Sequence, residues 1–105
     1  MITIGTGRGV GEYRASGRLH ILTCRQDYES IRVGDIIVIP RADSELVLWL
    51  DKITGIISLA GGVAAHLALI ALEAGIPYLV LSTGHESLTD GLRVVIDPVH
   101  GTIEA

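Results

Sequence analysis

The apolar residues of this chain fall into short aliphatic runs that are separated by glycine, proline and polar residues. Continuous runs of Ile, Val and Leu are typical of strands buried on both faces, and they predict such strands at 36–39, 53–59 and 78–81. Around Leu19 and Ile21 apolar and polar residues alternate, which predicts a strand with one wet face inside an extended segment. Shorter runs predict two further strands, over 92–96 and 101–104.

An apolar stretch between two of these strands predicts the main helix. It follows the pair Gly61-Gly62, and we expect it to begin near residue 63 with Gly62 as its N-cap. Gly75 suits the position just beyond a helix end, and Pro77 cannot continue a helix. Together these signals give the chain a β-α-β unit around one helix.

Two shorter helical segments are expected outside this unit. Ser44 predicts a helix cap before 45–52, with Leu46, Val47 and Leu50 facing inward, and 25–31 predicts a short helical turn. The order of elements therefore predicts an α/β fold with mixed sheets and one main helix, in a single domain over 1–105.

Glycines stand at the alternate positions 5, 7, 9 and 11. The phosphate-binding pattern G-x-G-x-x-G fails here, because Val10 and Glu12 occupy its sixth position, and no G-K-[ST] follows. We interpret this run as a flexible, bulge-rich edge strand.

The composition of the chain indicates an aliphatic core and argues against some classes of binding partner. Hydrophobic residues make up 49% of the chain with only four aromatic side chains, so the core is aliphatic and apolar surface remains for docking or for a homo-oligomer. A net charge of −4 and the absence of a Lys/Arg cluster along the sequence argue against nucleic acid and membrane surfaces. Cys24 stands alone, which predicts no disulfide framework and a cytoplasmic setting.

One stretch, 53–72, is long and apolar enough to be weighed as a membrane span. Three glycines interrupt it, and no basic or aromatic residues cluster at both of its edges. A buried strand, a turn and a buried helix are the better interpretation.

His66 is the one ionisable residue in that stretch, near the start of the predicted helix. We expect it at the end of the first turn, leaning back toward N–H groups that no polar side chain caps. An anion placed there gains hydrogen bonds and the positive end of the helix dipole. Because histidine is an established covalent nucleophile, the arrangement predicts a phosphoryl-carrying His66, with the phosphate bound at Gly61, Gly62, Val63 and Ala64.

The residues around His66 also resemble a known signature, Gly61-Gly62-x-x-x-His66-x-Ala68-x-x-Ala71-x-Glu73-x-Gly75-Ile76-Pro77. It is similar to the phosphohistidine motif of the PEP-utilising enzymes, roughly G-G-x-T-S-H-A-A-I-V-A-R-E-L-G-I-P. These are PEP synthase, pyruvate phosphate dikinase and enzyme I of the sugar phosphotransferase system. Further segments resemble the same mobile domain: Gly34-Asp35-Ile36-Ile37-Val38, Asp90-Gly91-x-x-Val94-x-Ile96-Asp97, Gly101-x-Ile103 and, less closely, Ser16-Gly17-Arg18.

The resemblance implies a swivelling β/β/α phosphohistidine-type domain. Its histidine would shuttle a phosphoryl group between an ATP-grasp-like nucleotide-binding partner and a PEP/pyruvate-binding partner. It implies that this chain holds no cofactor or metal itself, and that Mg and ATP or PEP belong to the partner domains. The chain would then be a phosphotransferase component rather than a complete enzyme.

The sequence departs from the motif at polar positions. Ala64-Ala65 replace the usual Thr-Ser, and Leu72 replaces the usual Arg. An alternative hypothesis is therefore a non-catalytic docking or regulatory module in which His66 is structural. A third is a domain that binds a carboxylate or phosphate at the helix N-terminus without covalent chemistry.

The other histidines give weaker signals. We expect His20 and His100 at the surface and Glu73 in solvent, whereas His85 lies in a loop that could approach the site. The sequence shows no set of residues with metal-ligand spacing.

Overall fold

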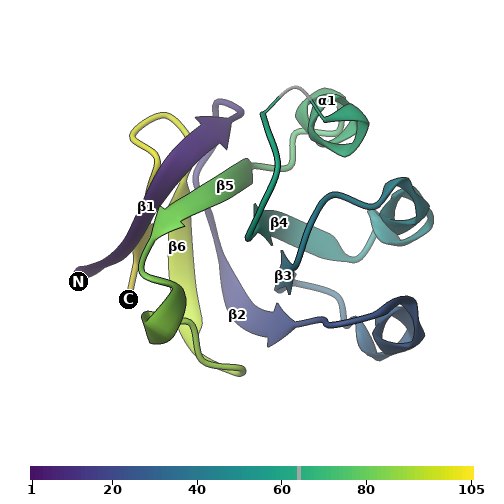
Figure 1. The fold of residues 1–105 in the computed structure, drawn as a ribbon, viewed down its shortest axis with the longest axis horizontal. Coiled ribbons are helices and arrows are strands. Elements are labelled where there is room, and N and C mark those ends of the chain that lie inside the picture. Colours follow the sequence, from purple (N-terminus) through teal and green to yellow (C-terminus); the bar gives the residue numbers. More distant parts are fainter. Residues whose placement is uncertain (64) are drawn as a thin grey trace.

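The computed structural model of this chain describes residues 1–63 and 65–105. Within these residues seven strands form one closed barrel in the order β1-β5-β4-β3-β2-β6-β7 (Figure 1). The strands are β1 Thr3–Val10, β2 Ala15–Ile21, β3 Asp35–Ile39, β4 Ile53–Ser58, β5 Tyr78–Thr83, β6 Arg93–Asp97 and β7 Thr102–Glu104. The helices are the short 3₁₀ helices η1 Arg25–Ser30, η2 Ser44–Trp49 and η3 His85–Ser87, and the α-helix α1 His66–Glu73.

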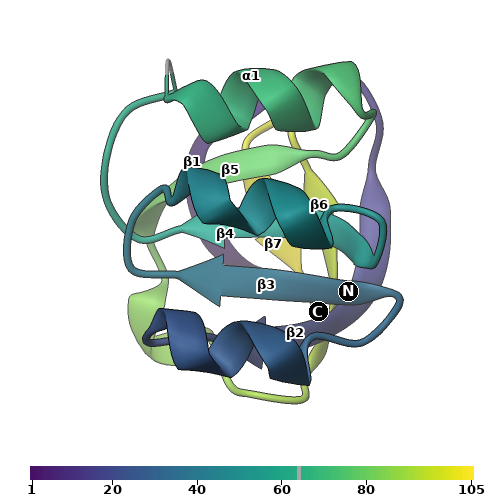
Figure 2. The ribbon, with the colours of Figure 1, turned by 90° about the vertical axis from the view of Figure 1, so that its right-hand side faces the viewer.

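One half of the barrel is parallel and the other antiparallel. Strands β2, β3, β4 and β5 pair in parallel, and a helix lies in each of the three crossovers between them. Parallel neighbours need such crossovers, because the chain has to return to the end of the sheet at which the previous strand began, whereas a tight turn joins only antiparallel strands. Figure 2 shows η1, η2 and α1 side by side in one layer over this half. The mixed sheet with one α-helix agrees with the expected fold class, whereas closure into a barrel was not anticipated.

The core has two apolar layers that the strand alternation separates. On β3, Ile36 and Val38 point into the barrel, while Ile37 and Ile39 point toward the helices. The layer under the helices includes buried residues of α1 and η2, namely Leu46, Leu67, Ala68 and Ala71. Because both faces of β3 are buried, its sequence is a continuous aliphatic run, as predicted.

Strand β1 is not the edge strand that we expected, because it pairs with β5 on one side and with β7 on the other. Register shifts interrupt both pairings, so the expected bulges are present. A Cβ atom at Gly7 would lie 2.0 Å from the Val80 carbonyl oxygen, and one at Gly9 would lie 2.1 Å from the Pro98 carbonyl oxygen. The glycines therefore allow the backbone of β1 to lie close to neighbouring backbone segments in the closed barrel.

The helix α1 begins at His66, three residues later than predicted. Gly61 adopts φ +103°, and Ala65, the residue before the helix, is extended with ψ 145°, so the preceding segment cannot continue the helix backward. Ala65 rather than Gly62 is the N-cap. At the other end Gly75 adopts φ +75° directly after the C-cap Ala74, as predicted.

The second expected helix is shorter and differently capped. Asp43, not Ser44, is the N-cap of η2, and its carboxylate accepts the Glu45 backbone N–H at 3.1 Å. Leu46 is fully buried as predicted, but Val47 is exposed. A 3₁₀ helix has three residues per turn, so Val47 rotates out of the face that an α-helix would have given it.

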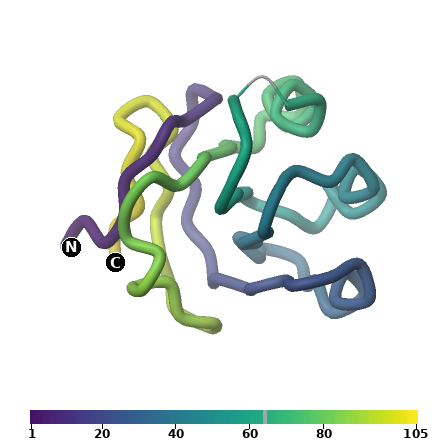
Figure 3. Tube along the Cα trace, viewed as in Figure 1, coloured from purple at the N-terminus to yellow at the C-terminus, as the bar shows by residue number. Residues whose placement is uncertain are grey.

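The two chain ends lie side by side. Ile2 and Ala105 exchange two backbone hydrogen bonds of 2.8 and 2.9 Å, and the tube trace shows both ends together (Figure 3). The stretch weighed above as a membrane span is β4, a loop and α1. In residues 1–63 and 65–105 no helix has the length and apolar character that crossing a membrane requires.

Candidate functional site

His66 is the first residue of α1 and is exposed. The loop that presents it leaves β4 at Ser58, whose buried hydroxyl donates a 2.6 Å hydrogen bond to the Ala60 carbonyl oxygen. Gly61 then turns the chain in the left-handed region, and the Ala65 N–H donates to the Gly62 carbonyl oxygen at 3.4 Å. The local sequence thus builds a tight loop that ends in a solvent-facing imidazole.

The helix N-terminus beside His66 has no side-chain cap. Ala65 offers no polar atom, and the first turn holds no acidic residue. The first intrahelical hydrogen bonds are donated by the N–H groups of Ala68 and Leu69, to the Ala65 carbonyl oxygen at 3.0 and 3.3 Å. An anion near His66 would therefore meet the positive end of the helix dipole without competition from a resident carboxylate.

The remaining predicted phosphate-binding residues lie in the loop upstream of the helix. Gly61 and Gly62 are exposed, whereas Val63 is half-buried and packs against the apolar layer under the helices. Ala64 falls outside the described residues. Because the helix starts at His66, the free N–H groups of its first turn belong to the helix itself rather than to the glycine pair. Phosphate binding by these four residues stays a prediction.

His66 stands at the carboxyl-terminal side of the parallel strands. Figure 2 shows β3 pointing toward the side on which α1 begins, and the loop carrying His66 leaves the carboxyl end of β4. In open α/β sheets ligands bind at this side. A hollow of about 250 Å³ also lies here, lined in part by Thr23, Arg25, Arg41 and Asp43.

Two hydrogen-bond networks were missed by sequence reasoning, because each joins residues distant along the chain. Asp43 accepts two hydrogen bonds from the Arg25 guanidinium, at 2.9 and 3.1 Å, and one from the Tyr28 hydroxyl at 2.6 Å. The hydrogen bond from Arg25, followed by that from Tyr28, holds the pKa of Asp43 well below its usual range. Burial, followed by the bond to Asp43, raises the pKa of Tyr28.

The second network corrects the prediction for His20, which is partly buried. Its Nδ1 lies 2.8 Å from Oδ2 of the buried Asp35, and its Nε2 lies 3.0 Å from the Ser30 hydroxyl. The prediction failed because the parallel pairing of β2 with β3, which supplies Asp35, is not visible in local sequence. His100 is exposed as expected, with Nδ1 2.8 Å from Asp97.

His85 does not approach His66. It begins η3, the green turn that follows β5 in Figure 1, and this turn lies on the far side of the barrel from α1. Glu73 is exposed, as expected. Among the described residues no group of three His, Cys, Asp or Glu side chains could hold a metal ion.

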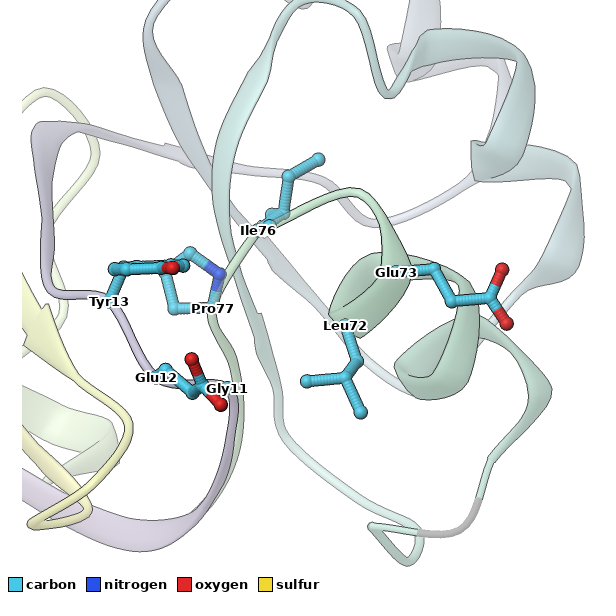
Figure 4. Close-up of a pocket in the computed structure, with 8 residues that line it drawn as sticks. Gly11, Glu12, Tyr13, Leu72, Glu73, Ile76 and Pro77 are labelled. Atoms are coloured by element: carbon cyan, nitrogen blue, oxygen red, sulfur yellow. The ribbon is translucent and has the colours of Figure 1, made fainter.

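The opposite end of α1 borders a hollow of about 270 Å³. Figure 4 shows Tyr13 against Pro77, Leu72 pointing into the space between the helix and the 11–13 loop, and the Glu73 carboxylate pointing away. Its charged lining residues, Glu12 and Glu73, are acidic. This hollow would repel a phosphoryl group and lies apart from His66.

A family model described as "PEP-utilising enzyme, mobile domain" matches residues 31–101, a segment that includes His66 and the whole parallel half of the barrel after β2. The chain belongs to this mobile-domain family. The match extends through the glycine pair, α1 and Gly75-Ile76-Pro77, the residues that carried the resemblance in the sequence.

Curated relatives of this mobile domain bear two kinds of name. A phosphoenolpyruvate synthase of Aeropyrum pernix is 34% identical over 94 residues, which cover 87% of this chain and 11% of that protein. Pyruvate kinase 2 of a Synechocystis species is 31% identical over 101 residues, covering 95% of this chain and 17% of that protein. The mobile domain thus spans less than a fifth of the length of each of these two relatives.

Solved structures share the fold at low sequence identity. An NMR structure of a UPF0107 protein has a TM-score of 0.74 at 20% identity, and 98% of each chain is covered. Aconitase X of Thermococcus kodakaraensis has a TM-score of 0.69 at 17% identity, with 95% of each chain covered. These likenesses establish the barrel fold for the mobile domain.

Proposed function

We propose that this mobile domain is a phosphocarrier in which His66 receives a phosphoryl group and passes it to an acceptor. The observation that carries the proposal is the position of His66: an exposed imidazole at the uncapped N-terminus of α1, inside the segment that the family model matches. A carrier histidine has to meet two partners in turn, so its ring has to face solvent.

The bonds that form and break in the proposed chemistry involve only the imidazole ring, the phosphoryl donor and the acceptor. A lone pair on one imidazole nitrogen attacks the phosphorus of the donor, and a P–N bond forms. The P–O bond to the leaving group breaks, and its electron pair stays on the leaving oxygen. In the return step an acceptor oxygen attacks the same phosphorus, and the P–N electron pair returns to the ring.

The mobile domain contributes mainly electrostatics and position. With Ala65 before His66 and Leu72 on the helix, neither a neighbouring hydroxyl at 65 nor an arginine at 72 is present to bind the phosphoryl oxygens. Backbone N–H groups at the start of α1 would carry that role, helped by the helix dipole. Such preorganised donors are the main requirement in phosphoryl transfer.

The partners of such a carrier would be a nucleotide-binding domain of ATP-grasp type and a PEP/pyruvate-binding domain. Mg and ATP or PEP would be bound by those partners, in the cytoplasm. The names of the phosphoenolpyruvate synthase and pyruvate kinase relatives support this choice of substrates.

The test is detection of phosphohistidine in protein isolated from its native cells and kept cold and alkaline for mass spectrometry. We expect the modification on the peptide that contains His66, and its loss in the His66→Ala variant. His85→Ala is the matched control, because His85 is also exposed at the start of a helix but lies far from α1. Label on another histidine, or none in native protein and none after incubation with a partner kinase, would contradict the proposal.

A docking module is the second candidate, and a specific observation favours it. Leu48 on η2 and Leu69 and Leu72 on α1 are 76%, 50% and 43% exposed, which leaves apolar surface along the helical layer. A docking module would bind its partner with equal affinity after His66→Ala and would carry no phosphate. A carrier would lose transfer in that variant while its fold stays intact.

A further inference from the structure

Strands β2 and β6 place two arginines directly opposite each other. Arg18 and Arg93 are cross-strand partners in this antiparallel pair. Both point away from the barrel interior, because their neighbours Leu19 and Val94 are buried inside it. Directly opposed like charges destabilise a strand pair. The fold therefore holds two positive charges together at a cost in stability.

Arg32 adds a third guanidinium from the segment before β3. The only carboxylate of the group, Asp35, is 2% exposed and already engaged. It accepts the Arg32 backbone N–H at 2.9 Å, hydrogen-bonds His20 at 2.8 Å and lies 3.6 Å from the Arg18 guanidinium. In residues 1–63 and 65–105 no carboxylate forms an ion pair with the guanidinium of Arg32 or Arg93.

These side chains line one hollow of about 420 Å³, together with Ser16 and the 33–34 turn. Three of the eight Lys and Arg residues of an acidic chain thus meet at one place. Sequence reasoning found no basic cluster, because the three arginines come from β2, the loop before β3 and β6. The clustering exists only in the folded barrel.

We propose that Arg18, Arg32 and Arg93 form a second anion site, which takes a small phosphate-bearing molecule. Three guanidinium groups and one carboxylate leave a formal charge of +2, which matches the roughly two negative charges of a phosphate monoester near pH 7. The guanidinium fork binds phosphate oxygens through paired hydrogen bonds, and the Ser16 hydroxyl supplies a further donor.

The shape of the site argues for a small ligand. Its volume falls within the range of about 300–1,000 Å³ that is typical of small-molecule pockets. A nucleic acid would need a basic stripe along a face. Here Arg18 and Arg32 also line a neighbouring hollow that contains the carboxylate of Asp90, so the positive charge forms a small local patch.

This site is separate from His66. Asp35 stands at the amino end of β3, whereas His66 follows the carboxyl end of the parallel strands (Figure 2). The inference therefore goes beyond the proposed phosphocarrier function and does not rest on it.

The test is a titration of ¹⁵N-labelled protein with inorganic phosphate and pyrophosphate at constant ionic strength, followed by NMR. We expect saturable shifts of the amides of 16–18, 32–35 and 93. Arg32→Gln and Arg93→Gln should each weaken binding about tenfold or more, because each removes charge-assisted hydrogen bonds. Arg8→Gln is the matched control, because Arg8 is an exposed strand arginine outside the hollow, and this variant should bind as the parent does.

The two test variants keep the pair between Arg18 and the buried Asp35, so their folds should persist, which circular dichroism checks. Equal affinity of parent, Arg32→Gln and Arg93→Gln would overturn the proposal. So would shifts confined to the start of α1, or shifts that sodium chloride alone reproduces. Tighter binding of a hexaglutamate peptide than of pyrophosphate would overturn the assignment to a small phosphate ligand and indicate an acidic protein partner.

Discussion

At the scale of single residues, Asp43 links the two 3₁₀ helices η1 and η2. Its carboxylate caps η2, accepts two hydrogen bonds from the Arg25 guanidinium and accepts one from the hydroxyl of the buried Tyr28. These contacts favour the ionised form, which is why its pKa is lowered. A group of this kind contributes stability above the unfolded-state pKa, and that stability is lost as the pH falls through the folded-state pKa.

We expect Asp43→Asn to lower the free energy of unfolding at pH 7 by about 1–2 kcal/mol. The difference from the parent should shrink as the pH drops below about 4, where the unfolded carboxyl takes up its proton. Urea unfolding at pH 7, 4 and 2.5 measures both effects. The exposed Asp51 provides the control Asp51→Asn, which should leave stability within about 0.5 kcal/mol. A constant difference at all three pH values would contradict the prediction.

The Tyr78 hydroxyl is a second informative atom. It is fully buried and has no hydrogen-bond partner within the described part of the chain. Burial raises the pKa of this hydroxyl, and the Ser58 side chain lowers it by a smaller amount. Tyr78→Phe removes a desolvated polar atom and keeps the ring, so we expect unfolding stability to rise by up to about 1 kcal/mol.

Tyr28→Phe is the matched comparison, because the Tyr28 hydroxyl donates to Asp43 and its loss should destabilise the protein. Chemical denaturation of both variants measures the contrast. Equal destabilisation by the two substitutions would show that the Tyr78 hydroxyl is satisfied in solution.

At the scale of elements, the N-terminus of α1 couples stability to the proposed function. Ala65 has cap geometry but no capping atom. Ala65→Asp should stabilise the protein by about 0.5–2 kcal/mol, because its carboxylate can accept the free N–H groups. The same carboxylate would occupy the phosphoryl position and repel it.

We therefore expect Ala65→Asp to melt at a higher temperature than the parent and to lose phosphorylation of His66. Ala65→Ser is the control for the charge, since it caps the helix without adding one. Phosphate labelling and thermal melts on the same samples measure the two effects. Undiminished labelling of Ala65→Asp would contradict anion binding at this helix end.

The close approach of β1 to its neighbours gives a prediction of its own. Gly9→Ala would place a Cβ atom 2.1 Å from the Pro98 carbonyl oxygen, and backbone would have to move to relieve the clash. We expect a loss of at least about 1–3 kcal/mol in unfolding stability. Gly62→Ala is the control, because no atom of residues 1–63 and 65–105 beyond its chain neighbours lies within 4 Å of its Cβ position and its φ is not positive. Similar denaturation midpoints for the two variants would contradict the expected clash.

The sequence predicted the elements whose signal is local. The aliphatic runs gave β3, β4 and β5 because strands buried on both faces must be apolar throughout. Gly75 and Pro77 gave the end of α1, since both act on the backbone of their own residue. His66 could be singled out because an ionisable ring in an apolar stretch is a local feature.

Features that depend on distant residues could not be predicted. Whether β1 lies at an edge depends on β7, nearly a hundred residues away, which closes the barrel beside it. The start of α1 was misplaced because Gly62 suits a cap, whereas the turn at Gly61 and the extended Ala65 delay the helix. The meeting of Arg18, Arg32 and Arg93 required the pairing of β2 with β6, which local pattern does not encode.

At the scale of the whole molecule, closure of the barrel depends on its last strand. β7 pairs with both β1 and β6, and Ile103 is fully buried in the barrel interior. Deletion of 102–105 would leave two strand edges unpaired and open the interior to water, so we expect an unfolded or aggregating protein. Circular dichroism and size-exclusion chromatography measure this outcome. Deletion of the exposed Met1 is the control and should be neutral.

The pairing of Ile2 with Ala105 has a mechanical consequence. Linkers attached to both ends would start from one point and would together act as a single pivot. The ends lie on one side of the barrel and α1 on the other (Figure 1), in a molecule 32 Å long. His66 would then lie far from the axis of rotation. A small rotation at the pivot would therefore move the imidazole over a long distance without any change inside the barrel.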